Sequence, residues 1–354
     1  MGGWVQGNPN LPYGAARVIL NEVTSGNPSL LQGYIEVGGQ RAEVIIANPA
    51  GISVDGAGFI NAAGVTLTTG TPVFNNSGNL ESYRVAALGG GRIAINGAGL
   101  DTSSADYTRI ISRAVEINSG LWANDLTLAA GTGSFAPEGT PLQPTEEDAS
   151  GRPLFAIDVA QIGGMYANKI FIIGNEYGVG VRNAGHIGAS AGQVTVTADG
   201  MLVNSGTINS SHMVAAVGGV QNTGNLYTQG QLVLNSDGTL SNQGTLAALG
   251  NVSLNAQNIQ NTTDGLIAAG MDNNGQFTGS GNLDVQAAQT LTNQGEILSA
   301  GHTAIAADTF NNRATTQAGG NLGITAQMLT NQNAQLIAGG EIRIQAGDPK
   351  CKIA

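Results

Sequence analysis

The stretch LTNQNAQLIAGGEIRIQA, residues 329–346, decides the fold because close copies of it recur at a fixed spacing. The preceding segments, FNNRATTQAGGNLGITAQ at 310–327 and LTNQGEILSAGHTAIAAD at 291–308, have the same small, amide-bearing and aliphatic character. One asparagine per copy marks the same position, and the intervals between successive members are 18, 20, 19, 32, 19 and 19: Asn204, Asn222, Asn242, Asn261, Asn293, Asn312 and Asn331. A fixed period of this length indicates a solenoid of stacked repeats.

Within each repeat the aliphatic residues step by two, as at Leu322 and Ile324 or Ile342 and Ile344. Period two is typical of a strand whose alternate side chains face inward, whereas helical repeats would show a period of 3.6. Leucine-rich repeats would need a denser leucine pattern. The sequence therefore predicts an all-β parallel β-helix with coils of about 19 residues. The one long step contains MDNNGQFTGSG, residues 271–281, which we interpret as a polar insert.

Glycine and asparagine mark the ends of the strand-like segments. We expect them at corners whose left-handed backbone angles other residues resist. Stacked at equivalent corners, the seven asparagines can hydrogen-bond to one another as a ladder.

Composition excludes several function classes. Only 10% of residues are charged, against about 25% in typical soluble domains. The net charge of −11 and the 13 scattered basic residues argue against nucleic acid or an anionic membrane surface as a partner. Cys351 is the single cysteine, so neither an intrachain disulfide nor a zinc cluster can form. No apolar run approaches the roughly 18 residues of a membrane span, and the start of the chain has no signal-peptide pattern.

The sequence divides into segments that differ in repeat regularity and composition. Residues 1–134 have blurred repeats and clear strand patterns, and residues 135–153 form a Pro-rich acidic loop or hairpin that leaves the coil. The β-helix is expected to continue through 154–200, to become a regular repeat shaft at 201–347 and to end in a tail at 348–354.

Two Asn-Pro phrases stand out in the first part. Asparagine before proline is a turn starter, because proline disfavours helical angles at the residue before it. The interval between the two asparagines is 40, close to twice a 20-residue coil, so the turns would share one side about 10 Å apart. The phrases consist of Asn8, Pro9, Asn10 and Leu11, and of Asn48, Pro49, Ala50, Gly51 and Ile52.

These phrases, with NPAGISVDGAGFINAAGVTLTTGTP (48–72) and YTRIISRAVEINSGLWANDLTLAAG (107–131), resemble the two-partner secretion domain of large bacterial exoproteins. That family includes filamentous hemagglutinins, secreted hemolysins and contact-dependent growth-inhibition toxins. The segment GGMYANKIFIIGNEYGVGVRNAGHI (163–187) looks like the region that follows this domain in the hemagglutinin and growth-inhibition types, and the later repeats resemble hemagglutinin repeats.

The resemblance implies a right-handed β-helix that a partner outer-membrane transporter exports after its periplasmic POTRA domains recognise the secretion domain. It would be secreted or displayed on a Gram-negative cell by way of the periplasm. The recognition motifs would map to Asn8, Pro9, Asn10 and Leu11 and to Asn48, Pro49, Gly51 and Ile52, with Ala50 departing from the usual asparagine. The signal and first strands of such a domain are expected to be missing here. Receptors on host or neighbouring cells would bind downstream regions.

Catalysis needs converging groups. The three histidines, His186, His212 and His302, lie far apart with no ligand-spaced carboxylate or cysteine, and GASAG at 188–192 lacks the strand-to-helix context of a nucleophile elbow. The acidic run 146–148 is interpreted as a solvated loop. We therefore expect no cofactor, no metal site and no enzymatic activity in this chain, whose shaft would serve adhesion or toxin presentation. The alternative is a carbohydrate-binding or carbohydrate-cleaving β-helix.

Overall fold

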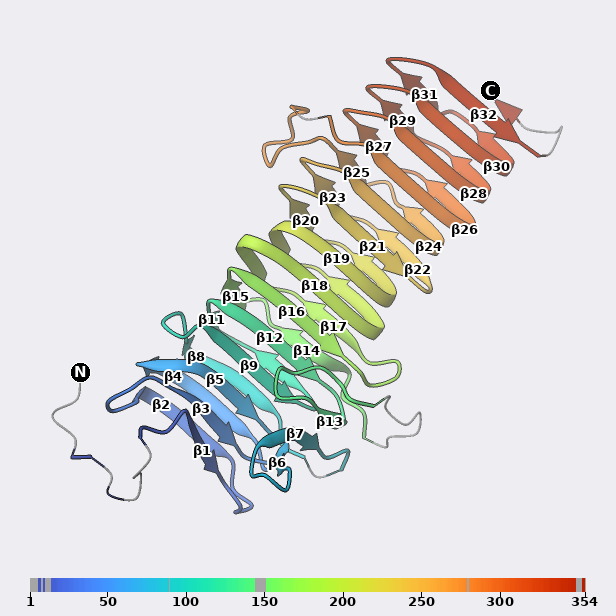
Figure 1. Ribbon diagram of the computed structural model, residues 1–354. Helices are drawn as coiled ribbons and strands as arrows, with labels where there is room; N and C mark the ends of the chain where they lie inside the picture. Colours follow the sequence, from blue (N-terminus) through green and yellow to red (C-terminus); the bar gives the residue numbers. More distant parts are fainter. Residues whose placement is uncertain are drawn as a thin grey trace. The chain divides into compact units, whose positions relative to one another are not determined.

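The computed structural model describes residues 6, 7, 9, 14–88, 90–143, 151–278, 280–347, 352 and 353, without the side chains of 190, 352 and 353. These residues form strands and turns and no helix, so the predicted all-β class is confirmed. Among them, accordingly, no helix is long and apolar enough to span a membrane. The chain consists of two compact units, Met1–Ser190 and Ala191–Ala354. In each, parallel strands are stacked coil upon coil (Figure 1).

In the first unit the coils build three strand faces. The first face contains β1 (Val18–Glu22), β3 (Ala42–Ala47), β5 (Ala62–Thr68), β9 (Tyr107–Ser112), β12 (Asp125–Ala130) and β16 (Lys169–Gly174). The other two faces share the long strands β2 (Ser29–Glu36), β4 (Ile52–Ile60) and β8 (Ile93–Asp101). They then separate into β10 (Val115–Ile117), β14 (Phe155–Val159) and β17 (Gly180–Asn183), and into β11 (Gly120–Trp122), β15 (Gly164–Ala167) and the start of β18 (His186–Asn204).

Coil length in this unit departs from the predicted even period. The sequence numbers of paired residues differ by 25 between β1 and β3, where Val18 pairs with Glu43, and by 18 between β9 and β12. They differ by 43 between β5 and β9 and by 44 between β12 and β16. The long steps occur because the chain leaves the coil to form a small antiparallel sheet of β6 (Thr71–Phe74), β7 (Leu80–Val85) and β13 (Gly133–Phe135).

This antiparallel sheet covers the outside of the first face. Tyr83 and Phe135 are fully buried against it, and burial raises the pKa of the Tyr83 phenol. The shared cluster consists of Ile45, Tyr83, Val85, Ile111, Ala129 and Phe135. The Pro-rich segment begins inside this sheet, since Phe135 also bridges to Pro141. Its acidic run, with Glu146, Glu147 and Asp148, lies outside the described residues.

The second unit is regular. One face contains the start of β19 (Thr207–Asn222), then β20 (Asn225–Thr228), β23 (Thr245–Ala248), β25 (Leu266–Ala269), β27 (Glu296–Ser299), β29 (Thr315–Ala318) and β31 (Gln335–Ala338). The other faces are formed by the rest of β19 with β21 (Leu232–Ser236), β22 (Thr239–Asn242), β24 (Val252–Asn261), β26 (Leu283–Asn293), β28 (Thr303–Asn312), β30 (Leu322–Asn331), β32 (Ile342–Ala346) and β33 (Lys352–Ile353). Apart from the insert, the predicted parallel coil and its period are confirmed here.

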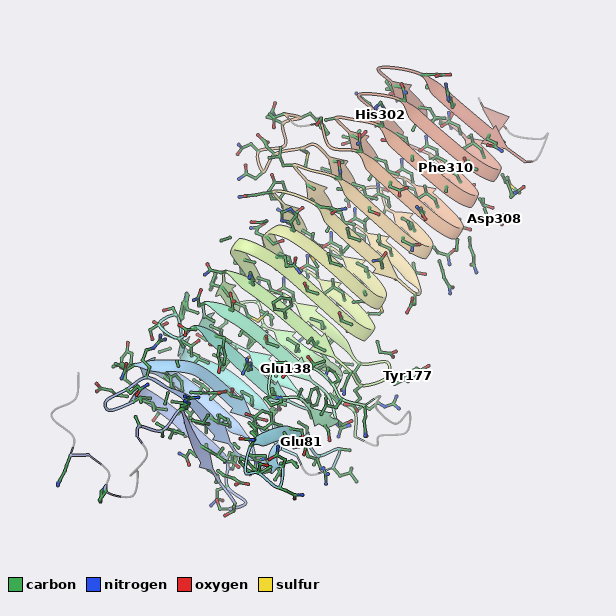
Figure 2. All side chains as sticks on the ribbon, viewed as in Figure 1. Glu81, Glu138, Tyr177, His302, Asp308 and Phe310 are labelled. Atoms are coloured by element: carbon green, nitrogen blue, oxygen red, sulfur yellow. The ribbon has the colours of Figure 1, made fainter. Side chains whose placement is uncertain are left out.

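The core of the second unit consists of columns of like side chains. Leu226, Leu246, Ile267 and Ile297 are in register on successive strands and are fully buried. Phe310 lies in another inward column and is fully buried, whereas Asp308, two residues earlier, is exposed (Figure 2). Each fully buried aliphatic side chain is worth about 1.5–3 kcal/mol relative to exposure, so the columns supply most of the attraction between coils.

The corner glycines of the repeats do not serve the purpose that the sequence suggested. Gly224, Gly244 and Gly295 are absent from the residues with positive φ, as are the asparagines of the predicted ladder. They are glycine because a Cβ at each would lie 2.1 Å from the carbonyl oxygen of the corresponding glycine one coil earlier. The prediction of left-handed corners is therefore wrong for these positions, and close stacking of backbone on backbone replaces it.

Gly244→Ala is expected to lower the free energy of unfolding by about 1–3 kcal/mol, because the obstructing atom is backbone and can move only if the coils separate. Urea denaturation measures this. Gly323→Ala is the matched control, since its nearest contact would be a carbonyl oxygen at an ordinary 3.9 Å. Equal effects of the two substitutions would contradict the stacking explanation.

Candidate recognition turn and buried polar ladder

The second Asn-Pro phrase forms a tight turn between β3 and β4. The Asn48 side-chain oxygen accepts a hydrogen bond from the Ala50 N–H at 2.9 Å, and the Asn48 carbonyl accepts one from the Gly51 N–H at 3.0 Å. Gly51 has φ of +117°, which a residue with a Cβ rarely adopts. The turn therefore needs an asparagine at its start and a glycine three residues later.

The Asn48 amide is also used by the preceding coil. Its NH₂ group donates to the Asn27 carbonyl at 3.0 Å and to the Ser29 hydroxyl at 2.8 Å, and the Asn48 side chain is fully buried. The Ser29 N–H in turn donates to the Gly51 carbonyl at 3.0 Å. In the folded unit both ends of this amide are thus engaged by the chain itself.

The following coil closes the other side of the turn. The Gly91 N–H donates to the Pro49 carbonyl at 2.7 Å, and a Cβ at Gly91 would lie 2.2 Å from the Ala50 carbonyl carbon. Gly51 and Ile52 are buried, whereas Pro49 and Ala50 are half-buried. Pro49 and Ala50 are consequently the parts of the motif that another protein could reach in the folded state.

The first Asn-Pro phrase cannot be compared in the same way. Asn8, Asn10 and Leu11 lie outside the described residues, and Pro9 is exposed. The premise of even coils is wrong next to Asn48, because Val18 of β1 pairs in register with Glu43 of β3, a longer step than the premise requires. Because Asn8 lies outside the described residues, a shared side for the two turns stays a prediction.

The seven repeat asparagines form one hydrogen-bonded chain. Each side-chain NH₂ donates to the side-chain oxygen of the next, at 2.7, 2.8, 2.9, 2.9, 2.9 and 2.7 Å in order from Asn204 to Asn331. All seven are buried. The contact from Asn261 to Asn293 is as short as the others although the insert lies between them in sequence, so the insert leaves the ladder intact.

Asn293→Ala is expected to destabilise the chain by about 1–3 kcal/mol, because it removes the buried amide–amide hydrogen bonds from Asn261 and to Asn312 and leaves the Thr315 carbonyl without the Asn293 donor. Chemical denaturation and amide hydrogen exchange at β26 and β28 test it. The exposed Asn255 offers the control substitution Asn255→Ala, for which we expect a change below about 0.5 kcal/mol.

Sequence reasoning missed a buried ion pair in the first unit. The Arg113 guanidinium donates to both carboxylate oxygens of Glu176, at 2.6 and 3.2 Å, and also to the Ala87 carbonyl. The Glu176 side chain is fully buried, and the two residues are 63 positions apart. The pair ties the segment that follows β7 to two coil corners, and no local pattern in the sequence indicates it.

Arg113→Met should cost about 3–5 kcal/mol of unfolding free energy, because it leaves the Glu176 carboxylate buried without a counter-charge. Replacing both residues, with Arg113→Met and Glu176→Leu together, should restore most of the loss. A double-mutant cycle measured by urea denaturation checks the coupling, and additive single effects would argue against it.

The histidines take separate structural positions. His302 Nδ1 accepts a hydrogen bond from the Asn321 N–H at 2.9 Å, and the His186 ring stacks on Tyr166 at 5.3 Å. The His212 ring lies over Gly230, where a Cβ would be 2.4 Å from Nε2. Within the described residues there is no group of three or more potential metal ligands, and GASAG lies inside strand β18.

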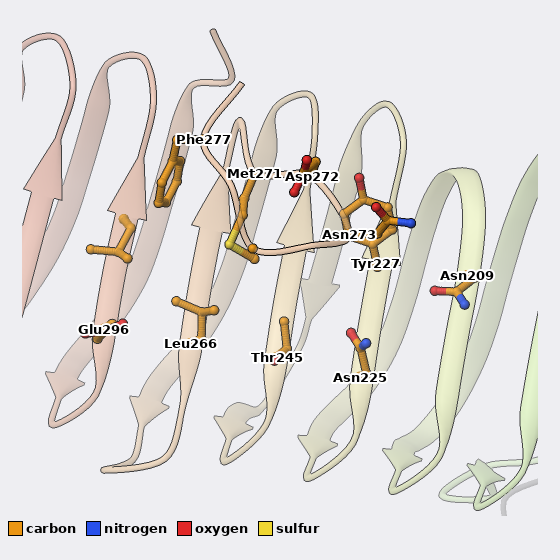
Figure 3. A pocket seen from close by; sticks show the side chains of 12 residues that line it. Asn209, Asn225, Tyr227, Thr245, Leu266, Met271, Asp272, Asn273, Phe277 and Glu296 are labelled. Carbon is orange, nitrogen blue, oxygen red and sulfur yellow. The ribbon is translucent and has the colours of Figure 1, made fainter. Parts of the chain in front are cut away.

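The insert at 271–281 makes a groove in the second unit. Figure 3 shows the insert crossing the strands, with Asn225, Thr245 and Leu266 in a row beside it. Met271 packs on Ala247 and Ala268, whose small side chains make room for it. The groove encloses about 540 Å³, and burial, then the charge of Asp272, raise the pKa of the Tyr227 phenol in it.

The in-register coils and the amide ladder define a parallel β-solenoid protein. Residues 7–204 match the family described as TPS secretion domain, and residues 167–276, 268–322 and 304–348 match the haemagglutinin repeat. Since the first match covers more than half of the sequence, the chain belongs to the TPS secretion domain family. The predicted resemblance is confirmed.

Similar curated proteins are much longer than this chain. Toxin CdiA of Yersinia pestis is 45% identical over 311 residues, covering 87% of this chain and 9% of the relative. The 16S rRNA endonuclease CdiA of Enterobacter cloacae subsp. cloacae is 37% identical over 351 residues, covering 98% and 10%. The chain therefore spans about a tenth of the length of these relatives.

Among solved structures, the filamentous hemagglutinin secretion domain is 26% identical, with a TM-score of 0.43 over 75% of each chain. Neither the matching families nor the two CdiA relatives support the carbohydrate-binding or carbohydrate-cleaving alternative.

Proposed function

We propose that this chain is the secretion domain of an exported exoprotein together with the first part of its β-helical shaft. The order of the matches supports this, because the secretion domain at 7–204 is followed by haemagglutinin repeats. Relatives named as toxins favour presentation of a toxin over adhesion as the role of the shaft. The exoprotein would be secreted or held at the surface of a Gram-negative cell.

The partner in export is an outer-membrane transporter, whose periplasmic POTRA domains bind the secretion domain before it is fully folded. The burial of Asn48 is the observation that carries this proposal. In the folded unit its amide is hydrogen-bonded within its own turn and to the coil before it. A transporter that reads this amide must therefore do so before these coils close.

In this proposal the shaft is a stiff rod whose successive coils are held in register. Each coil that folds outside the cell covers the apolar edge of the preceding coil, and stability grows as a sum of such nearest-neighbour terms. The seven-asparagine ladder keeps successive coils aligned, because a shifted coil would leave a buried amide without its partner. Toxic or enzymatic activity would belong to another module of the exoprotein, not to this chain.

The test compares two buried asparagines in the exoprotein that carries this chain, expressed with its transporter. Asn48→Ala is expected to abolish secretion, because it removes the recognition group. Asn222→Ala removes an equally buried, hydrogen-bonded amide from the ladder and is expected to leave most secretion intact. Immunoblotting of the culture medium and the periplasm measures both.

Circular dichroism of the purified chains provides the folding control. If both variants fold and both are secreted, Asn48 is a turn residue without a recognition role. If both lose secretion in proportion to their lost stability, folding of the coils alone explains export.

A further inference from the structure

Two exposed aromatic rings line one groove in the first unit, on the face to which β2, β4, β8 and β11 contribute. Tyr34 is 73% exposed and Trp122 is 42% exposed, which is unusual for such large side chains. Register places Tyr34 opposite Gly58, Gly58 opposite Asp101, and Asp101 opposite Trp122. The two aromatic residues thus lie three coils apart in one column.

Each ring lies over a glycine. A Cβ at Gly58 would be 2.5 Å from Tyr34 Cε1, so the tyrosine ring covers the coil that follows its own. A Cβ at Gly120 would be 2.2 Å from Trp122 Cη2, so the indole lies over its own strand, and its edge reaches Gly99 of the preceding coil, where a Cβ would be 3.1 Å from Cζ3. The groove lies between the two rings, over residues of β4 and β8.

The Trp122 indole stacks on an aromatic ring of the next coil. Tyr166, on the next coil, stacks with Trp122 at a centroid distance of 6.1 Å and an interplanar angle of 14°. Trp122 consequently has a neighbour that fixes its orientation before anything enters the groove, which reduces the entropy lost on binding.

The groove between the rings contains a carboxylate. It encloses about 520 Å³ and is lined by Tyr34, Gly56, Ala57, Ala98, Asp101, Ser103 and Trp122. Asp101 Oδ1 accepts from the Ser103 N–H at 3.0 Å and from its hydroxyl at 2.6 Å, which leaves Oδ2 as an acceptor. No basic side chain is among these lining residues.

We propose that this groove binds a cationic side chain, lysine or arginine, presented by a partner protein. Two aromatic rings and one carboxylate at the groove would attract an ammonium or a guanidinium by cation–π and charge interactions. The net charge of −11 makes a basic partner surface complementary to the chain. This inference does not depend on how the Asn48 turn is used.

The test uses the whole chain with Trp4→Phe, which leaves Trp122 as its single tryptophan. Nα-acetyl-arginine amide and Nα-acetyl-lysine amide are titrated while Trp122 fluorescence is followed, with Nα-acetyl-glycine amide at equal ionic strength as the blank. A saturable change is expected with both cations. Asp101→Asn and Tyr34→Ala should each weaken it roughly fivefold or more, whereas Tyr34→Phe should retain it.

Asp264→Asn is the matched carboxylate control, since it lies exposed in the second unit and should leave the titration unchanged. Circular dichroism confirms that every variant is folded. The proposal is overturned if the cations cause no saturable change, or if Asp101→Asn binds them as well as the parent. It is equally overturned if maltose or phosphocholine vesicles change the fluorescence and the two amides do not.

Discussion

Register is the constraint on which the rest of this structure depends. Each coil pairs in parallel with its predecessor, so a side chain meets the residue at the same position one coil away. Leu226, Leu246, Ile267 and Ile297 pack as a column for this reason, and the asparagines from Asn204 to Asn331 bond as a row. Where backbone meets backbone, only glycine fits, as at Gly244.

Much of this architecture could be predicted because it is periodic. Alternation at Leu322 and Ile324 indicated strands, and the spacing of seven asparagines indicated the coil. The reason for the corner glycines was predicted wrongly, because a sequence shows that a residue lacks a Cβ and not what the Cβ would meet. The irregular coils of the first unit escaped prediction because an antiparallel sheet of three strands interrupts them.

Only the local part of the candidate site could be predicted from the sequence. Local chemistry was enough to identify Asn48–Ile52 as a turn. Its burial depends on Asn27, Ser29 and Gly91, which are neighbours only once the coils have stacked. The Arg113–Glu176 pair and the groove between Tyr34 and Trp122 likewise bring together residues whose spacing follows no repeat. Contacts that depend on insertions between the coils cannot be predicted from the repeat period of the sequence.

The amide ladder also has a direction. Every bond from Asn204 onward runs from the NH₂ group of one asparagine to the oxygen of the asparagine in the coil that follows. Their dipoles therefore point the same way and polarise one another. Turning one amide around would set oxygen against oxygen on one side and NH₂ against NH₂ on the other. The orientation of the first amide therefore sets the orientation of all later amides. The row behaves as a single polar unit and not as seven independent side chains.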